Sequence, residues 1–321
     1  MLTPETSPMS MQPLVSIIIP CFNSEAWITN AIHSALNQTW KPIEVVVIDD
    51  GSTDGSLKAI KAFGDAIRWE TGPNRGGCAA RNRGIELAHG EFIQFLDSDD
   101  VLVPDCVEGK MAFRCADDER VCCGVESCDA ASAAKMVDYW QGPFHDLEFM
   151  IRRGAPSTPG PLHRKRDLEA IGGFRADLRC AQEFDLHLRM AAQLGIRFVS
   201  NGKIGAKIFR RDGSVSLSAG KRMFVVSAEI LMDLWRSMEH LPSVDREKIA
   251  SAISQRLTGI ARTLYWRGAR EEAAALVKTA LVLHPSWYRT AYRTKVGGVL
   301  AQFLGFETFE WLHQVLRRGK R

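Results

Sequence analysis

Three carboxylates follow a short apolar run near residue 100 of this chain. The run ends at Leu96, and the next residues are Asp97, Ser98, Asp99 and Asp100. Carboxylates gathered at the end of a buried strand are costly unless a positive group lies beside them. Hard oxygen ligands in an open cluster suit Mg²⁺ or Mn²⁺, ions that often bind substrate phosphates as well. The cluster therefore predicts a site for a divalent metal and a diphosphate, with an ordinary acidic loop as the alternative.

Polar segments follow three separate apolar runs in the first hundred residues. These segments are 20–23, 49–52 and 97–100. Because short β-branched runs alternate with amphipathic helical patterns, we expect a parallel sheet covered by helices on both faces. In such sheets, ligands bind beyond the carboxyl ends of the strands. The three polar segments are therefore expected to converge on one edge of the sheet.

Hydrophobic periodicity and turn residues define the expected elements. Strands are expected at 15–20, 43–48, 67–71, 91–96, 121–125, 196–200 and 207–209, and helices at 25–38, from 54, at 76–89, 105–114, 162–171 and 183–194. Residues 126–160 are expected to form a loop-rich acceptor region. From residue 220 onward the pattern is helical, with a pair of antiparallel helices over 247–284.

Composition excludes several classes of protein. A chain of 321 residues with 45% hydrophobic and 25% charged residues is typical of a soluble globular protein. A net charge of +3 is too small to indicate a nucleic-acid partner, and no segment has the roughly 18 to 20 apolar residues of a membrane span. The eight cysteines form no Cys-x-x-Cys pair, which favours free thiols in a reducing cytoplasm. Residues 1–13 are expected to be a disordered lead-in.

Taken in order, the motifs resemble those of family 2 glycosyltransferases of the GT-A fold, over roughly residues 14–215. The motifs are Val15–Asn23, Asp49-Asp50-Gly51-Ser52-Thr53-Asp54, Ala80-Arg81-Asn82-x-Gly84, Gly90-Glu91-Phe92 and Leu96–Asp100. The resemblance implies an α/β fold with a Rossmann-like, mostly parallel sheet flanked by helices, followed by an α-helical C-terminal region. We expect a catalytic domain at 14–218, with a nucleotide-binding part at 14–104 and an acceptor side at 105–218, and a helical region at 219–321.

The resemblance also implies a donor site and a metal ligand. Its donor-binding residues are Pro20, Phe22, Asn23, Asp50, Arg81, Asp97 and Ser98, and Asp99 is the metal ligand. Phe22 would lie against the nucleobase, Asp50 would accept from a base N–H, and Arg81 would pair with the diphosphate or base. The alternatives are a core aromatic for Phe22, turn and cap roles for Asp49 and Asp54, and a solvated helix arginine for Arg81. Asp100 is expected to cap the next segment.

The candidate base departs from the pattern of the family. In the run 182–189, Glu183 occupies the position of the usual catalytic aspartate and is one methylene longer. A base must come within about 3 Å of the proton that it removes. We favour Glu183, with Asp185 as the other candidate. A purely structural role for both, as helix-capping residues that pair with Arg189, stays open.

The resemblance implies an inverting, metal-dependent glycosyltransferase that uses Mg²⁺ or Mn²⁺. It would transfer one sugar from a nucleotide-diphosphate sugar, expected to be a UDP-sugar, to a glycan or lipid-linked acceptor in bacterial surface polysaccharide or glycolipid synthesis. No Gly-x-Gly-x-x-Gly follows the first strand, which disfavours a dehydrogenase. The chain also lacks a Gln-x-x-Arg-Trp segment, and this absence argues against a processive synthase and for the transfer of single sugars. The altered base motivates a rival, a catalytically weak nucleotide-sugar-binding module with a helical assembly region.

The C-terminal residues leave three interpretations open. An apolar face over 299–316 precedes the basic run Arg317–Arg321. Such a helix can lie on the inner face of the cytoplasmic membrane, pack on the catalytic domain or form a homodimer. Residues 210–214 are expected to be a mobile loop over the diphosphate or an exposed basic turn. His145 and His163 are not assigned to the site.

Overall fold

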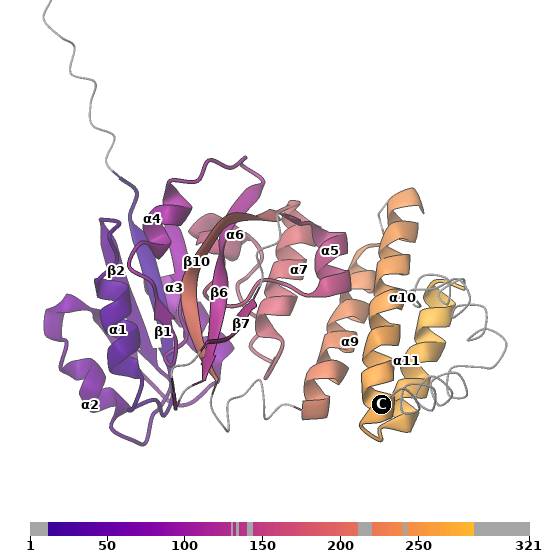
Figure 1. The fold of residues 1–321 in the computed structure, drawn as a ribbon, viewed down its shortest axis with the longest axis horizontal. Coiled ribbons are helices and arrows are strands. Elements are labelled where there is room, and N and C mark those ends of the chain that lie inside the picture. Colours follow the sequence, from indigo (N-terminus) through magenta and orange to yellow (C-terminus); the bar gives the residue numbers. More distant parts are fainter. Residues whose placement is uncertain are drawn as a thin grey trace, which may run out of the picture. The chain divides into compact units, whose positions relative to one another are not determined.

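The structure is a computed structural model that describes residues 12–129, 131–132, 135–139, 144–210, 220–239 and 243–285 (Figure 1). These residues form two compact units. The first contains the described residues of 12–139, 156–179 and 198–210, and the second those of 144–155, 180–197 and 220–285. The expectations for residues 1–11, the loop residues 211–214 and the C-terminal face at 299–316 fall outside the described residues.

A mostly parallel sheet forms the centre of the first unit. Its strands are β1 (Val15–Cys21), β2 (Ile43–Asp49), β3 (Arg68–Thr71), β4 (Phe92–Phe95) and β9 (Leu162–Arg164), in the order β3-β2-β1-β4-β9. The first four are parallel, as predicted, and β9 is antiparallel to β4. Cys21 pairs with Asp49, so β1 and β2 end at the same level. The polar segments that follow them therefore begin side by side.

The predicted helix at 162–171 is wrong for its first three residues, which form the strand β9. Leu162 and His163 are buried, and the His163 ring packs 5.6 Å from the ring of Phe95 on β4. A buried, extended pairing with the sheet overrides the helical spacing of this segment, and helix α6 begins only at Lys165. His163 is thus a core residue in this sheet.

A second sheet was not foreseen from the sequence. Its strands are β5 (Val101–Leu102), β10 (Arg197–Arg210), β6 (Glu119–Asp129) and β7 (Lys135–Tyr139), in the order β5-β10-β6-β7. The two short strands predicted at 196–200 and 207–209 are one continuous strand. The sequence did not show this, because the polar residues and two glycines between them interrupt the strand pattern. In the expected loop-rich region, Asp146 caps α5 (Leu147–Arg153) by accepting from the Phe149 N–H at 2.7 Å.

Short helices flank the sheet strands of the first unit. They are α1 (Ile28–Leu36), α2 (Ser56–Lys61), the 3-10 turn η1 (Gly64–Ala66), α3 (Gly77–Leu87), α4 (Cys106–Met111) and α6 (Lys165–Ala170). The buried face of α1 joins the core formed by β1 and β2. In α3, a Cβ at Gly84 would lie 2.3 Å from Ile18 Cγ2, so only glycine allows this approach to β1. All eight cysteines are free, as predicted, and all but Cys115 are buried.

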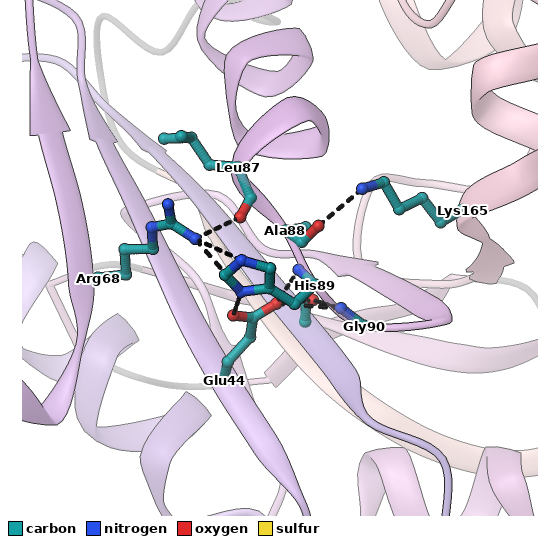
Figure 2. Close-up of polar contacts among 8 residues, drawn as sticks. Glu44, Arg68, Leu87, Ala88, His89, Gly90 and Lys165 are labelled. Carbon is teal, nitrogen blue, oxygen red and sulfur yellow. Dashed lines mark hydrogen bonds and ion pairs between the residues drawn. The ribbon is translucent and has the colours of Figure 1, made fainter.

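Two cations bind carbonyl groups at the C-terminal end of α3. Arg68 Nη1 donates to the Leu87 carbonyl at 2.7 Å, and Lys165 Nζ donates to the Ala88 carbonyl at 2.7 Å (Figure 2). Positive charge is favourable there because the last carbonyls of a helix lack partners and carry partial negative charge. The end of α3 away from the expected site is therefore anchored.

Glu44 holds the backbone that follows α3. Its carboxylate accepts hydrogen bonds from the Ser16 hydroxyl, from the His89 N–H and from the Gly90 N–H, as Figure 2 shows for the last two. Burial raises the pKa of Glu44, but these hydrogen bonds outweigh it and the pKa lies below its ordinary value. The ionised form is thus favoured in the folded chain.

Replacing Glu44 is expected to destabilise the fold in a pH-dependent way. Glu44→Gln should lower the free energy of unfolding near pH 7 by about 1–3 kcal/mol, since hydrogen bonds to a charged group are lost. Because the folded-state pKa is depressed, this contribution is complete above the unfolded pKa of about 4.3 and is lost as pH falls through the folded pKa. Urea denaturation near pH 7 and near pH 4 measures it, with exposed Glu91→Gln as the control. Equal stability of the two variants near pH 7 would refute this role.

The second unit is helical apart from the short strand β8 (Phe144–His145). Its helices are α5, α7 (Gln182–Leu194), α9 (Gly220–Ser237), α10 (Ser243–Trp266) and α11 (Arg270–Leu283). The helices α10 and α11 pack side by side and join at Gly268, whose φ is 81°, which confirms the predicted helix pair (Figure 1). Within the described residues, no helix is both long and apolar enough to cross a membrane.

Candidate active site

The loops after β1 and β2 are joined by hydrogen bonds. The Asn23 N–H donates to the Ser52 hydroxyl at 3.0 Å, and Asn23 Oδ1 accepts from the Thr53 N–H at 2.8 Å. Asn23 has a φ of 47°, a conformation that asparagine tolerates better than most residues. The Phe22 side chain beside it is 46% exposed. The alternative of a core aromatic for Phe22 is therefore wrong.

Asp50 connects β2 to the start of α3. One carboxylate oxygen accepts from the Arg75 N–H and the other from the Gly76 N–H, each at 2.8 Å. The close approach requires Gly51, whose φ is 76° and where a Cβ would lie 2.8 Å from the Asn74 nitrogen. An ionised carboxylate has about four acceptor positions, so Asp50 keeps capacity for a further donor.

The neighbouring aspartates order the turn after β2, and the N-cap residue of α2 is Gly55, so the cap role left open for Asp54 is not found. Asp49 accepts from the Thr71 hydroxyl at 2.6 Å, and Asp54 accepts from the Ser56 N–H at the start of α2 at 3.0 Å. These contacts order the loop after β2. Asp50 is then the acidic residue of this segment that faces α3.

Arg81 of α3 forms an ion pair with Asp97. The Nη2–Oδ1 distance is 2.5 Å, and the guanidinium lies 5.3 Å from the centroid of the Phe174 ring. Arg81 is only 6% exposed, so the alternative of a solvated helix arginine is wrong. The pair places a cation beside the acidic turn, where positive charge offsets the cost of holding several carboxylates close together.

The turn after β4 alternates between buried and partly exposed side chains. Ser98 and Asp100 are buried, and Asp97 and Asp99 are partly exposed. The turn closes through a hydrogen bond from the Asp100 N–H to the Asp97 carbonyl at 3.1 Å. The Asp100 carboxylate accepts from the Phe209 N–H of β10 at 3.0 Å, whereas the sequence predicted a cap for the next segment.

The acidic turn fits a metal that is shared with a substrate. Among the described residues, no three His, Cys, Asp or Glu side chains gather in a way that could hold a metal ion. Asp99, with Asp97 beside it, offers one or two carboxylates at most. Mg²⁺ is typically bound through one or two carboxylates together with substrate phosphates and water. The residues therefore fit a divalent cation that binds with a diphosphate.

Sequence reasoning missed one arginine near the start of α3. A Cβ built at Gly76 would lie 2.9 Å from Arg179 Nη1, and the φ of Gly76 is 96°. Arg179 is exposed. It therefore adds positive charge where the free N–H groups of a helix already favour an anion. No motif marks Arg179, which lies about a hundred positions after Gly76 in the chain.

The two candidate bases lie on the first turn of α7 in the second unit. Asp185 is 2% exposed and accepts from Arg189 Nε and Nη2, both at 2.8 Å. Its pairing with Arg189 is confirmed. Glu183 is partly exposed, and Ala181, just before the helix, has a φ of 56° that non-glycine residues rarely adopt. The structure thus separates the environments of the two carboxylates.

The sheet, the acidic turn and the loops beside it define a nucleotide-diphospho-sugar type of α/β fold. The chain belongs to the Glycosyl transferase family 2, whose family model matches residues 16–186, more than half of its length. This match confirms the family that the motifs predicted.

Individual relatives match mainly the nucleotide-binding part. An uncharacterized glycosyltransferase of Haemophilus influenzae is 44% identical over 105 residues, which are 32% of this chain and 42% of that protein. The hyaluronan synthase of Pasteurella multocida is 44% identical over 107 residues, which are 32% of this chain and 11% of the synthase. The chain thus matches less than half the length of these relatives.

Solved structures share the fold over most of the chain. TarS 1-349 of S. aureus in complex with UDP-GlcNAc has a TM-score of 0.66 at 19% identity, covering 95% of this chain and 92% of that one. The mannosyltransferase PcManGT of Pyrobaculum calidifontis, in complex with GDP-Man and Mn²⁺, has a TM-score of 0.55 at 17% identity, covering 91% and 80%. The predicted GT-A fold is confirmed.

Proposed function

We propose that this chain is a metal-dependent, inverting glycosyltransferase that moves one sugar from a nucleotide-diphosphate sugar, expected to be a UDP-sugar, to an acceptor. The observation that carries the proposal is the linked set of loops at the carboxyl edge of the sheet. Phe22 is exposed on the loop after β1, and Asp97 and Asp99 are partly exposed on the turn after β4. Membership of the family supports the reaction class.

Donor binding is assigned to the first unit. Phe22 supplies an exposed ring for the nucleobase, Asp50 an acceptor for a base N–H, and Arg81 a cation beside the diphosphate. The first N–H groups of α3 favour phosphate oxygens. Asp99, with Asp97 nearby, would hold the divalent cation, which when bound neutralises charge on the departing nucleotide. The remaining donor residues, Pro20, Asn23 and Ser98, shape the loops.

The acceptor proton is assigned to Glu183. Its environment supports this choice, because Asp185 is buried in an ion pair with Arg189 and Glu183 is partly exposed. Inversion by single displacement needs one base, and a positioned base contributes on the order of 10² to 10⁴ in rate.

The acceptor is inferred from the names of the relatives. Hyaluronan and chondroitin synthases among them support a glycan or lipid-linked acceptor in bacterial surface polysaccharide or glycolipid synthesis. We place this reaction on the cytoplasmic side of the membrane. Contact of the C-terminal residues with the membrane surface, and a homodimer, are alternatives for the helical region.

Phe22→Ala is expected to weaken nucleotide binding about 10-fold, because stacking of a base on an aromatic ring contributes on the order of 1–3 kcal/mol. Phe113→Ala is the matched control, since Phe113 is also an exposed phenylalanine of the first unit, at 38% against 46%. Calorimetric titration with UDP in Mn²⁺ measures both affinities. Equal affinities for the two variants would remove Phe22 from the donor site.

Donor turnover tests the proposed reaction. The chain is incubated with UDP-, GDP- and dTDP-sugars in Mn²⁺, release of the nucleoside diphosphate is followed, and proton NMR identifies the anomer of the released or transferred sugar. Release from a UDP-sugar with inverted configuration supports the proposal. Tight nucleotide binding without release from any donor would favour the rival, a binding module whose helical region serves assembly.

A further inference from the structure

Side chains of the acidic turn reach three other elements of the first unit. Asp97 pairs with Arg81 of α3, and the Asp100 carboxylate accepts from the Phe209 N–H of β10 at 3.0 Å. The hydroxyl of Ser98, between them, lies 2.8 Å from the hydroxyl of Ser24. The turn that carries Asp99 is therefore tied to α3, to β10 and to the loop after β1.

The Ser98 contact connects the turn to the nucleobase side of the site. Ser24 Oγ also donates to the Phe22 carbonyl at 3.2 Å, and the Ser24 N–H donates to the Ser56 hydroxyl at 2.8 Å. A hydroxyl has one proton to donate. Either hydroxyl can be the donor in the hydrogen bond between Ser24 and Ser98. One hydrogen-bonded chain thus runs from the acidic turn to the residue with the exposed ring.

The Asp100 contact closes the opposite side of the turn. Directly after Asp100, Leu102 pairs with Ala206 of β10 in an antiparallel register. The Phe209 ring stacks on the Trp27 ring with centroids 6.5 Å apart. Asp100 is 3% exposed, and its carboxylate is engaged with backbone. It therefore acts as a structural acceptor inside the protein, in contrast to the partly exposed Asp99.

We propose that Ser98 and Asp100 are positioning residues that fix the turn so that Asp99 meets the cation bound with the nucleotide. The proposal rests on the function proposed above, because it assumes a cation at Asp99. Under this proposal Asp100, the third carboxylate of the cluster, is not a metal ligand. It acts through its hydrogen bond to β10, and its charge is not required at the cation.

Two substitutions of Asp100 separate positioning from metal ligation. Asp100→Asn keeps an oxygen that can accept from the Phe209 N–H, and Asp100→Ala removes it. Calorimetric titration with UDP and Mn²⁺ should show Asp100→Asn within about 3-fold of the native affinity and Asp100→Ala weaker by about 10-fold or more, the range expected for a lost hydrogen bond to a charged group. Exposed Asp65→Asn is the control for charge alone. Equal losses for the two Asp100 variants would identify a metal ligand and overturn the proposal.

Amide hydrogen exchange without nucleotide reports the same contact independently. Exchange at Phe209 should be faster than native in Asp100→Ala and unchanged in Asp100→Asn. If Asp100→Ala does not fold, the pair Ser24→Ala and Ser98→Ala replaces it: each single variant should weaken UDP–Mn²⁺ binding, and the double variant should add little further loss. Additive or absent losses would overturn the positioning role. If the variants show the expected exchange at Phe209 but the native chain does not bind UDP with a metal, the contacts of Asp100 are confirmed and the proposed function is refuted. The positioning role at the cation then fails together with the proposed function.

Discussion

Glu183→Gln is expected to lower turnover by on the order of 10² to 10⁴ while donor affinity stays at the native value. The amide has nearly the same shape as the carboxylate but cannot accept the acceptor proton. Glu183 lies on the first turn of α7 and is partly exposed, so the substitution changes a position that is open to solvent in part. Steady-state kcat with a transfer acceptor and calorimetric affinity for UDP measure the two effects separately.

Two further variants define the specificity of this result. Glu183→Asp returns the carboxylate length that is usual in the family and should keep part of the turnover. Asp185→Asn should mainly reduce stability, because it weakens a buried ion pair with Arg189. Native-level turnover in Glu183→Gln, together with lost turnover in a stably folded Asp185→Asn, would assign the base to Asp185 instead.

Asp99→Ala is expected to remove most of the affinity for Mn²⁺ in the presence of UDP, on the order of 100-fold or more. The reason is the small number of protein ligands: no larger group of metal-binding side chains exists among the described residues, so the loss of one carboxylate cannot be compensated. Electron paramagnetic resonance of free Mn²⁺, titrated with protein at fixed UDP, measures this affinity.

The control for Asp99 is a change of charge away from the site. Asp65→Asn removes one carboxylate from an exposed position on the turn η1 and should leave Mn²⁺ affinity unchanged. A similar small loss in both variants would mean that Asp99 contributes only to the general electrostatic field of the protein.

The first sheet could be predicted because three of its strands have a clear local sequence pattern. Each of β1, β2 and β4 is an apolar run that ends in a polar motif, and helical spacing separates them. The second sheet could not, since β10 contains Gly202 and Gly205 within a polar stretch and has no regular alternation. The strand β9 was mistaken for helix because its few residues gain their conformation from pairing with β4.

The candidate site was predicted as separate residues, and the structure supplies their partners. Arg81 and Asp97 came from different motifs, and only the fold shows that they pair. The contacts of Asp100 with β10 and of Arg179 with the start of α3 join segments about a hundred positions apart in the chain. No local pattern encodes such tertiary contacts, so the sequence could assign different roles to Asp99 and Asp100 but could not show that Asp100 accepts from β10.

Calorimetric titration of the native chain with UDP, once in Mn²⁺ and once after chelation, tests the central claim most directly. The claim is that the loops after β1, β2 and β4 bind a nucleoside diphosphate together with a divalent cation. We predict saturable binding in Mn²⁺ that weakens strongly on chelation. Binding of GDP or dTDP but not UDP would keep the site and change the donor. Absence of binding to all three nucleotides, with the chain folded, would contradict the account.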